Sequence, residues 1–220
     1  MDSARGFARS SIGRKVIMAS TGVILVVYVI GHMLGNLQVY GGPEGINAYG
    51  KFLHTFLHGQ AIWIARVVLL AAVLLHIWSA TSLTLTSRRA RAVGYRERQW
   101  TESTYASRTM RWGGVIILLF VIYHILHFTT GTAHPDFVPG DVYHNFVTGF
   151  RVVPVSIAYI VAMIALGLHL RHGVWSMFQT LGVSHPRYIR AAHVAAWIVA
   201  IVVTAGNISF PLAVLAGIVK

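Results

Sequence analysis

The chain has 220 residues, of which 55% are hydrophobic and only 11% carry a formal charge. Soluble domains carry about 25% charged residues, so this composition excludes an ordinary soluble protein and indicates an integral membrane protein. The sequence contains no cysteine, which excludes disulfides and any iron–sulfur cluster held by thiolates of this chain.

Five apolar stretches are long enough to cross a bilayer, which takes about 20 residues of helix. We expect transmembrane helices at approximately 16–36, 61–86, 112–130, 152–180 and 191–217, in one all-α membrane domain over residues 1–220. The connecting links are short, so the five helices should form an antiparallel bundle. The basic N-terminal region resembles the start of a signal peptide. The apolar run behind it is too long and has no cleavage pattern, so the first helix is expected to be retained.

The link between the first two helices should contain a tight turn and a short helix. Tyr40 to Gly45 includes three glycines and a proline, which favour a turn. Asn47 to His58 has an amphipathic pattern and is expected to lie as a helix at the outer membrane interface. His54 and His58 would then share one face of that helix, four residues apart.

A net charge of +12 is also found in proteins that bind nucleic acid. The positions of the 18 basic residues along the chain decide whether that reading holds. Four lie on one side of the predicted bundle: Lys51, Arg66, Arg151 and Lys220. The other fourteen precede the first helix or lie in or near the second-to-third and fourth-to-fifth links: Arg5, Arg9, Arg14, Lys15, Arg88, Arg89, Arg91, Arg96, Arg98, Arg108, Arg111, Arg171, Arg187 and Arg190. This asymmetry predicts a multi-pass protein of the cell inner membrane with a cytoplasmic N-terminus, and it argues against nucleic acid.

Four successive apolar segments each carry a histidine near one end, at intervals of 44, 48 and 45 residues: His32, His76, His124 and His169. A histidine inside a bilayer costs free energy unless a partner satisfies its ring nitrogens. Neutral imidazole is an axial ligand of haem iron, and a chain without cysteine cannot attach a haem covalently. The four histidines are therefore interpreted as iron ligands of two b-type haems.

The antiparallel topology sorts these histidines by depth. With a rise of about 1.5 Å per helical residue, His32 and His124 fall toward the outer face, and His76 and His169 fall toward the cytoplasmic face. The first pair would hold an outer haem and the second an inner haem. An iron with histidine on both axial positions has no open site for a substrate, so electron transfer is the function that remains.

Several alternatives stay open at this stage. A single histidine in a helix bundle is more often a hydrogen-bonding residue than a ligand. His127 competes with His124, and His172 competes with His169, because each pair is three residues apart on roughly one helix face. The deeper member of each pair is preferred, and the other could serve a haem propionate or a proton. Two arginines could also pair with propionates or simply anchor the helices at the interface: Arg171 and Arg66.

Two strings go beyond spacing: Gly31 to Gln38 and His169 to Ser176. Together with the segments around His76 and His124, they resemble the single-chain, five-helix, dihaem cytochrome b membrane anchor of succinate dehydrogenases and fumarate reductases. The resemblance extends over roughly Ser11 to Gly182. In that family one haem is held by ligands on the first and third helices, and the other by ligands on the second and fourth. This pairing agrees with the depth argument.

The resemblance implies an electron-transfer subunit of succinate:quinone oxidoreductase that does not itself touch succinate. It implies a flavoprotein with FAD and an iron–sulfur protein docked on the cytoplasmic face. Electrons would pass between the iron–sulfur partner and a quinone, most often menaquinone in this family, as part of the respiratory chain and the tricarboxylic acid cycle.

The quinone would need polar donors near the inner haem. Four residues at the cytoplasmic end of the first helix could supply them, and they would equally serve as helix caps and topology signals: Ser10, Ser11, Arg14 and Ser20. Some relatives use an outer glutamate for menaquinol proton transfer, and the one outer glutamate here is Glu44. His54 and His58 could take that role instead, although a solvated helix face explains them as well.

Two rival functions remain. One is a dihaem cytochrome b of another respiratory complex, of the hydrogenase or formate dehydrogenase type. The other is a multi-pass transporter whose histidines bind a metal or carry protons. A transporter would be colourless and would contain a broken helix at mid-membrane.

Overall fold

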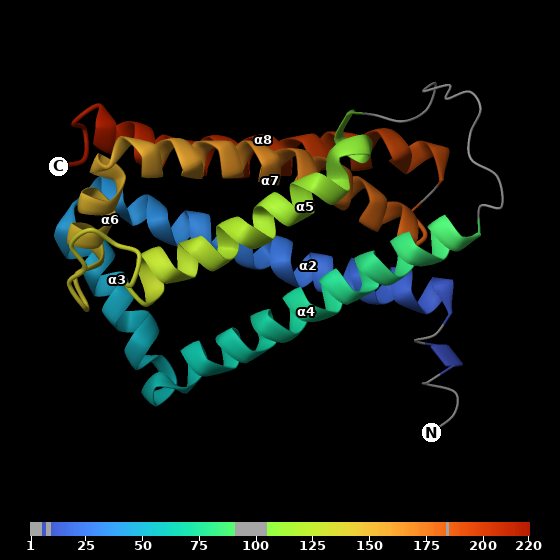
Figure 1. The fold of residues 1–220 in the computed structure, drawn as a ribbon, viewed down its shortest axis with the longest axis horizontal. Coiled ribbons are helices and arrows are strands. Elements are labelled where there is room, and N and C mark those ends of the chain that lie inside the picture. The colour runs from blue at the N-terminus through green and yellow to red at the C-terminus, as the bar shows by residue number, and fades with distance from the viewer. Residues whose placement is uncertain (1–5, 8–9, 91–104, 184) are drawn as a thin grey trace.

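The computed structural model describes residues 6–7, 10–90, 105–183 and 185–220. Every regular element within these residues is a helix, and five helices are long and apolar enough to cross a membrane. They run alongside one another as one elongated bundle (Figure 1): α2 (Ser11–Asn36), α4 (Gln60–Arg89), α5 (Tyr105–His124), α7 (Val153–Thr180) and α8 (Pro186–Leu215). The predicted all-α, five-helix membrane fold is confirmed.

The two ends of the bundle differ in charge. Two short helices, α3 (Pro43–Thr55) and α6 (Val142–Arg151), lie together at one end, called here the α3–α6 end (Figure 1). The opposite end, called the arginine-rich end, carries the first turn of α2, the last turn of α4 and the first turn of α8, with these basic residues: Arg14, Lys15, Arg88, Arg89, Arg187 and Arg190. Three further predicted members lie on described helices, Arg108 and Arg111 on α5 and Arg171 on α7. The remaining five, Arg5, Arg9, Arg91, Arg96 and Arg98, lie outside the described residues. The charge asymmetry in the sequence is therefore an asymmetry between the two ends of the described bundle.

Capping side chains fix where two of the spanning helices, α2 and α8, begin. α2 starts at Ser11, five residues before the predicted apolar run, because the Ser10 hydroxyl accepts a hydrogen bond from the Gly13 amide at 2.9 Å. α8 starts at Pro186, and the His185 ring accepts from the Arg187 amide at 3.2 Å. These two helices extend into polar sequence because side chains satisfy their first backbone amides.

The short helix after α2 differs from its prediction. α3 begins at Pro43 and ends at Thr55, and a 3-10 turn, η2 (Phe56–Gly59), leads into α4. Leu57 and His58 adopt left-handed backbone conformations, with φ of 50° and 56°. The expectation that His54 and His58 share one helix face is therefore wrong, since the helix ends between them.

The link before α7 contains a helix that the sequence analysis missed. Asp141 caps α6, its carboxylate accepting from the His144 amide and from the Asn47 side chain, both at 3.0 Å. These two hydrogen bonds hold the pKa of Asp141 below its ordinary value. One face of α6 is buried, and its apolar residues recur at helical spacing: Tyr143, Phe146, Val147 and Phe150. An aspartate cap followed by this pattern was a readable signal.

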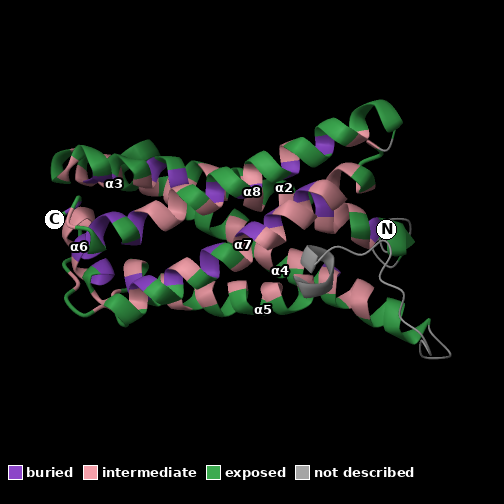
Figure 2. Cartoon of the chain, turned by 90° about the horizontal axis from the view of Figure 1, so that it is seen from above, coloured by how far each residue is buried: buried purple, intermediate pink, exposed green. Residues whose placement is uncertain are grey.

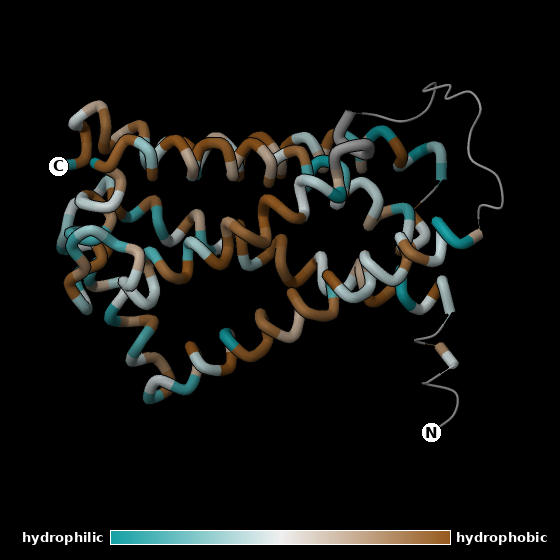
Figure 3. Tube along the Cα trace, in the orientation of Figure 1, coloured by the Kyte–Doolittle hydropathy of each residue, from teal (hydrophilic) through white to brown (hydrophobic). Residues whose placement is uncertain are grey.

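Burial in the bundle is confined to the lines where helices meet. Figure 2 shows buried residues as short patches along the helices, and Figure 3 shows that hydrophobic residues predominate along the spanning helices. Val67, Leu70 and Ile201 are each more than half exposed, as expected of side chains that face lipid. α7 and α8 approach closely at Gly167, where an added Cβ would collide with the Thr204 hydroxyl.

Candidate functional site

Two histidines meet between α2 and α5 toward the α3–α6 end. The ring centroids of His32 and His124 are 5.7 Å apart, and the ring planes are nearly perpendicular at 86°. Tyr28 stacks on His32, one turn away on the same helix. The Nε2 atom of His32 lies 3.2 Å from the amide nitrogen of Asn36. These two histidines form what we call the outer pair.

A second pair of histidines meets between α4 and α7. The ring centroids of His76 and His169 are 6.3 Å apart, with a 58° angle between the planes. The Nδ1 atom of His76 lies 3.2 Å from the Thr21 hydroxyl of α2. The Nδ1 atom of His169 is buried and has no hydrogen-bond partner among the described residues. We call these two histidines the inner pair.

The two pairs occupy different levels of the bundle. Thr21, which contacts His76, is eleven residues before His32 on α2. At 1.5 Å per residue this separates the two levels by roughly 16 Å along the helix axis. The inner pair is the one nearer the arginine-rich end. The histidines of the first and third spanning helices thus meet each other, as do those of the second and fourth. The depth argument from the sequence expected these two pairs.

The spacing within each pair suits one metal ion between two imidazoles. Two metal–nitrogen bonds of about 2.0–2.1 Å, with about 1.1 Å from each nitrogen to its ring centre, separate the ring centres by roughly 6.3 Å. The observed distances are 6.3 Å and 5.7 Å. Within the described part of the chain, no three or more histidine or acidic side chains gather to hold an ion. A two-histidine site fits a metal whose remaining ligands come from a macrocycle, as in haem.

Glycines on α2 and α5 lie next to the rings of the inner pair. A Cβ added at Gly22 of α2 would lie 3.6 Å from the His76 ring, and one added at Gly114 of α5 would lie 4.0 Å from the His169 ring. The helices that do not supply these two ligands therefore present no side chain at those points. Together with the unsatisfied Nδ1 atom of His169, the absence of side chains at these two points fits a haem held by the two histidines.

The structure separates His124 from His127. The α-helical hydrogen bonding of α5 ends at His124, and Ile125–Thr129 forms a π-helical turn, η3. The π turn widens the helix between the two residues, and although both rings reach the Tyr159 hydroxyl, only His124 meets His32. His127 is fully buried against α6, where an added Cβ at Gly149 would lie 2.8 Å from its ring. It also stacks on His134 at 4.8 Å.

Comparison with known protein families decides which class of protein carries these pairs. Residues 87–206 match the succinate dehydrogenase/fumarate reductase transmembrane subunit family, which is more than half of the chain. The chain belongs to this family. The family resemblance predicted from the sequence is confirmed, and the matched region contains one histidine of each pair, His124 and His169. No curated protein and no solved structure gives a significant match.

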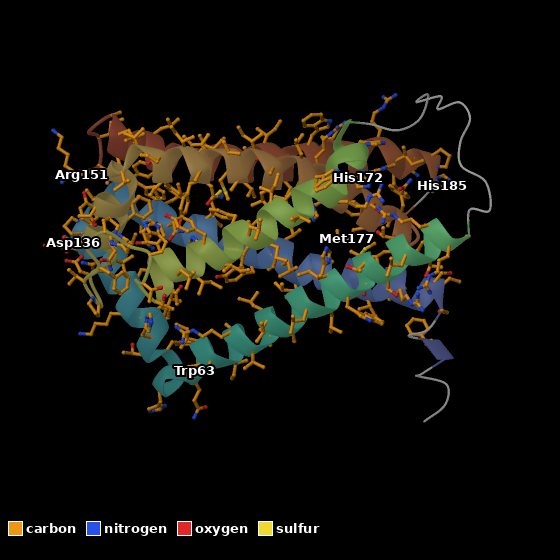
Figure 4. All side chains as sticks on the ribbon, viewed as in Figure 1. Trp63, Asp136, Arg151, His172, Met177 and His185 are labelled. Carbon is orange, nitrogen blue, oxygen red and sulfur yellow. The ribbon has the colours of Figure 1, made fainter. Side chains whose placement is uncertain are left out.

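The transmembrane subunit is therefore a multi-pass membrane component of a redox enzyme that contains further subunits. His172, the rival of His169, is half-buried on α7 toward the arginine-rich end (Figure 4). Its ring makes no contact with His76 or another aromatic ring among the described residues. The structure thus brings His169, and not His172, to His76.

The two arginines considered for propionates both pack on tryptophan rings. The Arg171 guanidinium lies 4.2 Å from the ring centre of Trp197 on α8. Arg66 is exposed and lies 4.8 Å from the ring centre of Trp63, one turn earlier on α4. Both contacts are cation–π interactions worth about 0.5–1 kcal/mol at exposed sites. The propionate role of each arginine stays a prediction.

The residues considered for quinone binding lie at the arginine-rich end but do not form one cluster. The Ser10 hydroxyl caps α2 and donates to the Phe7 carbonyl at 2.8 Å. Arg14 donates to the Thr86 hydroxyl at 3.1 Å and so joins the start of α2 to the end of α4. Two further serines, Ser11 and Ser20, are exposed on α2. Glu44, considered for outer proton transfer, is exposed in the first turn of α3.

Sequence reasoning missed the polar partners of the histidines. Thr21 contacts His76, and the Tyr159 hydroxyl lies 3.2 Å from His124 Nδ1 and 3.0 Å from His127 Nδ1. These partners are 55 and 35 or 32 residues away along the chain. No local pattern identifies them, because the contacts exist only where separate helices pack together.

Proposed function

We propose that this transmembrane subunit passes electrons between an iron–sulfur partner and a quinone through two bis-histidine b haems. His32 and His124 would hold the outer haem, and His76 and His169 the inner haem. The observation that carries the proposal is the presence of two cross-helix histidine pairs at a spacing suited to one metal ion each. The family membership of the chain supports the same role.

The chemistry of such a site is limited to electron transfer. A bound haem supplies a one-electron redox centre whose potential depends on its ligands and surroundings. With both histidines of a pair bound to the iron, no coordination site would remain for oxygen or a substrate. The apolar helices around them would keep water away, and the glycines beside the inner pair would present no side chain to the bound group.

We infer that the arginine-rich end faces the cytoplasm, because basic residues accumulate on the cytoplasmic side of membrane proteins. A flavoprotein with FAD and an iron–sulfur protein would dock there. The inner pair lies nearer this end, so electrons from the iron–sulfur partner would reach it first. A second cytochrome b assignment, to a hydrogenase or formate dehydrogenase, has no support from the family match.

The quinone, with menaquinone the first candidate, is proposed to bind at the same end. The polar groups available on α2 are Ser11, Arg14 and Ser20, with Ser10 at its cap. Arg14 already bridges to Thr86 at the end of α4, so a quinone there would contact two helices. The outer-face role of Glu44 stays a prediction.

The rival transporter function finds no support in the described helices. α2, α4, α7 and α8 continue unbroken through their middles, and the change from α to π in α5 comes only at its end. A broken helix at mid-membrane, which that function requires, is not among the described residues.

Reduced-minus-oxidised spectroscopy of the purified complex tests the proposed function. We expect two b haems per copy of the chain, with low-spin, bis-histidine electron paramagnetic resonance signals, and co-purification of a subunit with covalently bound flavin. Fewer than two such haems would refute the proposal. A nickel or molybdenum subunit in place of the flavoprotein would favour the other cytochrome b class.

A further inference from the structure

We propose that Thr21 and Tyr159 are positioning residues that fix the proton of a haem ligand, Thr21 for His76 and Tyr159 for His124. The proposal rests on the proposed haem-binding function. It adds that each pair contains one histidine whose Nδ1–H is held by a hydroxyl from a different helix. The second ring nitrogen, Nε2, then keeps its lone pair for iron.

The Thr21 hydroxyl already donates its proton within α2, so toward His76 it can act only as an acceptor. Its hydroxyl lies 2.7 Å from the Ile17 carbonyl and 3.1 Å from the Met18 carbonyl. Carbonyl oxygens only accept, so the hydroxyl proton points to them. The Thr21 oxygen can therefore only accept from His76 Nδ1, at 3.2 Å. Thr21 is buried, so water does not compete. The Met18 backbone also hydrogen-bonds His76, and since its carbonyl can only accept, we assign the His76 proton to Nδ1.

Tyr159 is shared between two histidines but has only one proton to give. Its oxygen lies 3.2 Å from His124 Nδ1 and 3.0 Å from His127 Nδ1, and the side chain is buried. One phenol proton cannot serve both nitrogens, so at least one histidine must donate to the oxygen. We assign that donation to His124, which leaves the phenol proton for the shorter contact to His127. His124 then presents an unprotonated Nε2 atom.

The two remaining histidines have no such partner. His169 Nδ1 is buried without a partner in the described part of the chain. The polar contact of His32 is Asn36, which lies beside its Nε2 atom and would have to move when that nitrogen binds iron. Each pair thus combines one ligand with a fixed proton and one without. Hydrogen bonding to Nδ1–H makes an imidazole a stronger donor to the metal, so these two hydroxyls should lower the potentials of their haems.

Isosteric variants of the holo-complex test this inference, with one haem as internal reference for the other. Thr21→Val should raise the midpoint potential of the inner haem, change its electron paramagnetic resonance signal, and weaken its retention by about 10–100-fold. The outer haem should be unchanged, and Thr21→Ser should restore the inner one. Tyr159→Phe should have the corresponding effect on the outer haem alone.

Two matched controls separate positioning from packing. Thr148→Val removes a hydroxyl with the same bond to the carbonyl four residues earlier, at 2.7 Å, but with no histidine ring as acceptor or donor. Tyr123→Phe removes a phenol that stacks on His127 and has no hydrogen bond to a described residue. Neither should shift a haem potential.

The outcomes distinguish this inference from the proposed function. Unchanged potentials and signals for both haems in Thr21→Val and Tyr159→Phe would overturn the positioning roles while two haems remain bound. A shift that Thr21→Ser does not reverse would also overturn the role of Thr21. Absence of haem from the wild-type complex would instead refute the proposed function.

Discussion

Replacing His127 with alanine is expected to destabilise the transmembrane subunit without removing a haem. The ring is fully buried, stacks on Tyr123 and His134, and contacts the Tyr159 hydroxyl. Truncating a buried aromatic ring to alanine costs about 3–5 kcal/mol. Asparagine keeps a polar atom near the Nδ1 position, so His127→Asn should recover about 1 kcal/mol, the net value of one hydrogen bond.

The matched change at His124, in contrast, should remove a haem. His124 faces His32 across the bundle, so His124→Ala should reduce the haem content from two per chain to one. Haem counting by the pyridine haemochrome spectrum, with thermal unfolding in detergent, separates the two effects. A haem lost in His127→Asn and retained in His124→Ala would refute the assignment of His124 as the ligand.

Three further outcomes follow from the same geometry. His169→Ala should remove the inner haem, whereas His172→Ala should leave two haems in the difference spectrum. Gly22→Leu should also lose the inner haem, since its side chain would fill the space beside His76, and a retained second haem would contradict that reading. Asp141→Ala should lower stability by about 0.5–2 kcal/mol through loss of the α6 cap. Because the folded pKa of Asp141 lies below its ordinary value of 3.8, the wild-type advantage is complete above about pH 4 and is lost as the pH falls through the folded pKa, which acid unfolding curves of both proteins would show.

The ends of the helices show what a hydropathy pattern can and cannot predict. The apolar runs predicted five spans because a bilayer demands about 20 apolar residues from each of them. They did not predict that α2 begins at Ser11 or that α3 ends at Thr55. Helix ends depend on capping hydrogen bonds and on local backbone conformations such as the left-handed Leu57. α6 was missed although Asp141 and the apolar spacing behind it are visible in the sequence.

The candidate site divides in the same way. Sequence by itself determined the fold class, the charge asymmetry and the pairing of His32 with His124 and of His76 with His169, because helix rise and antiparallel order fix the depth of a residue. Only the tertiary structure decided which neighbouring histidine meets His32, since His127 packs instead on His134 and against α6. The hydroxyl partners also depend on tertiary packing, because a contact between two helices depends on the rotation and approach of both and no single segment encodes it.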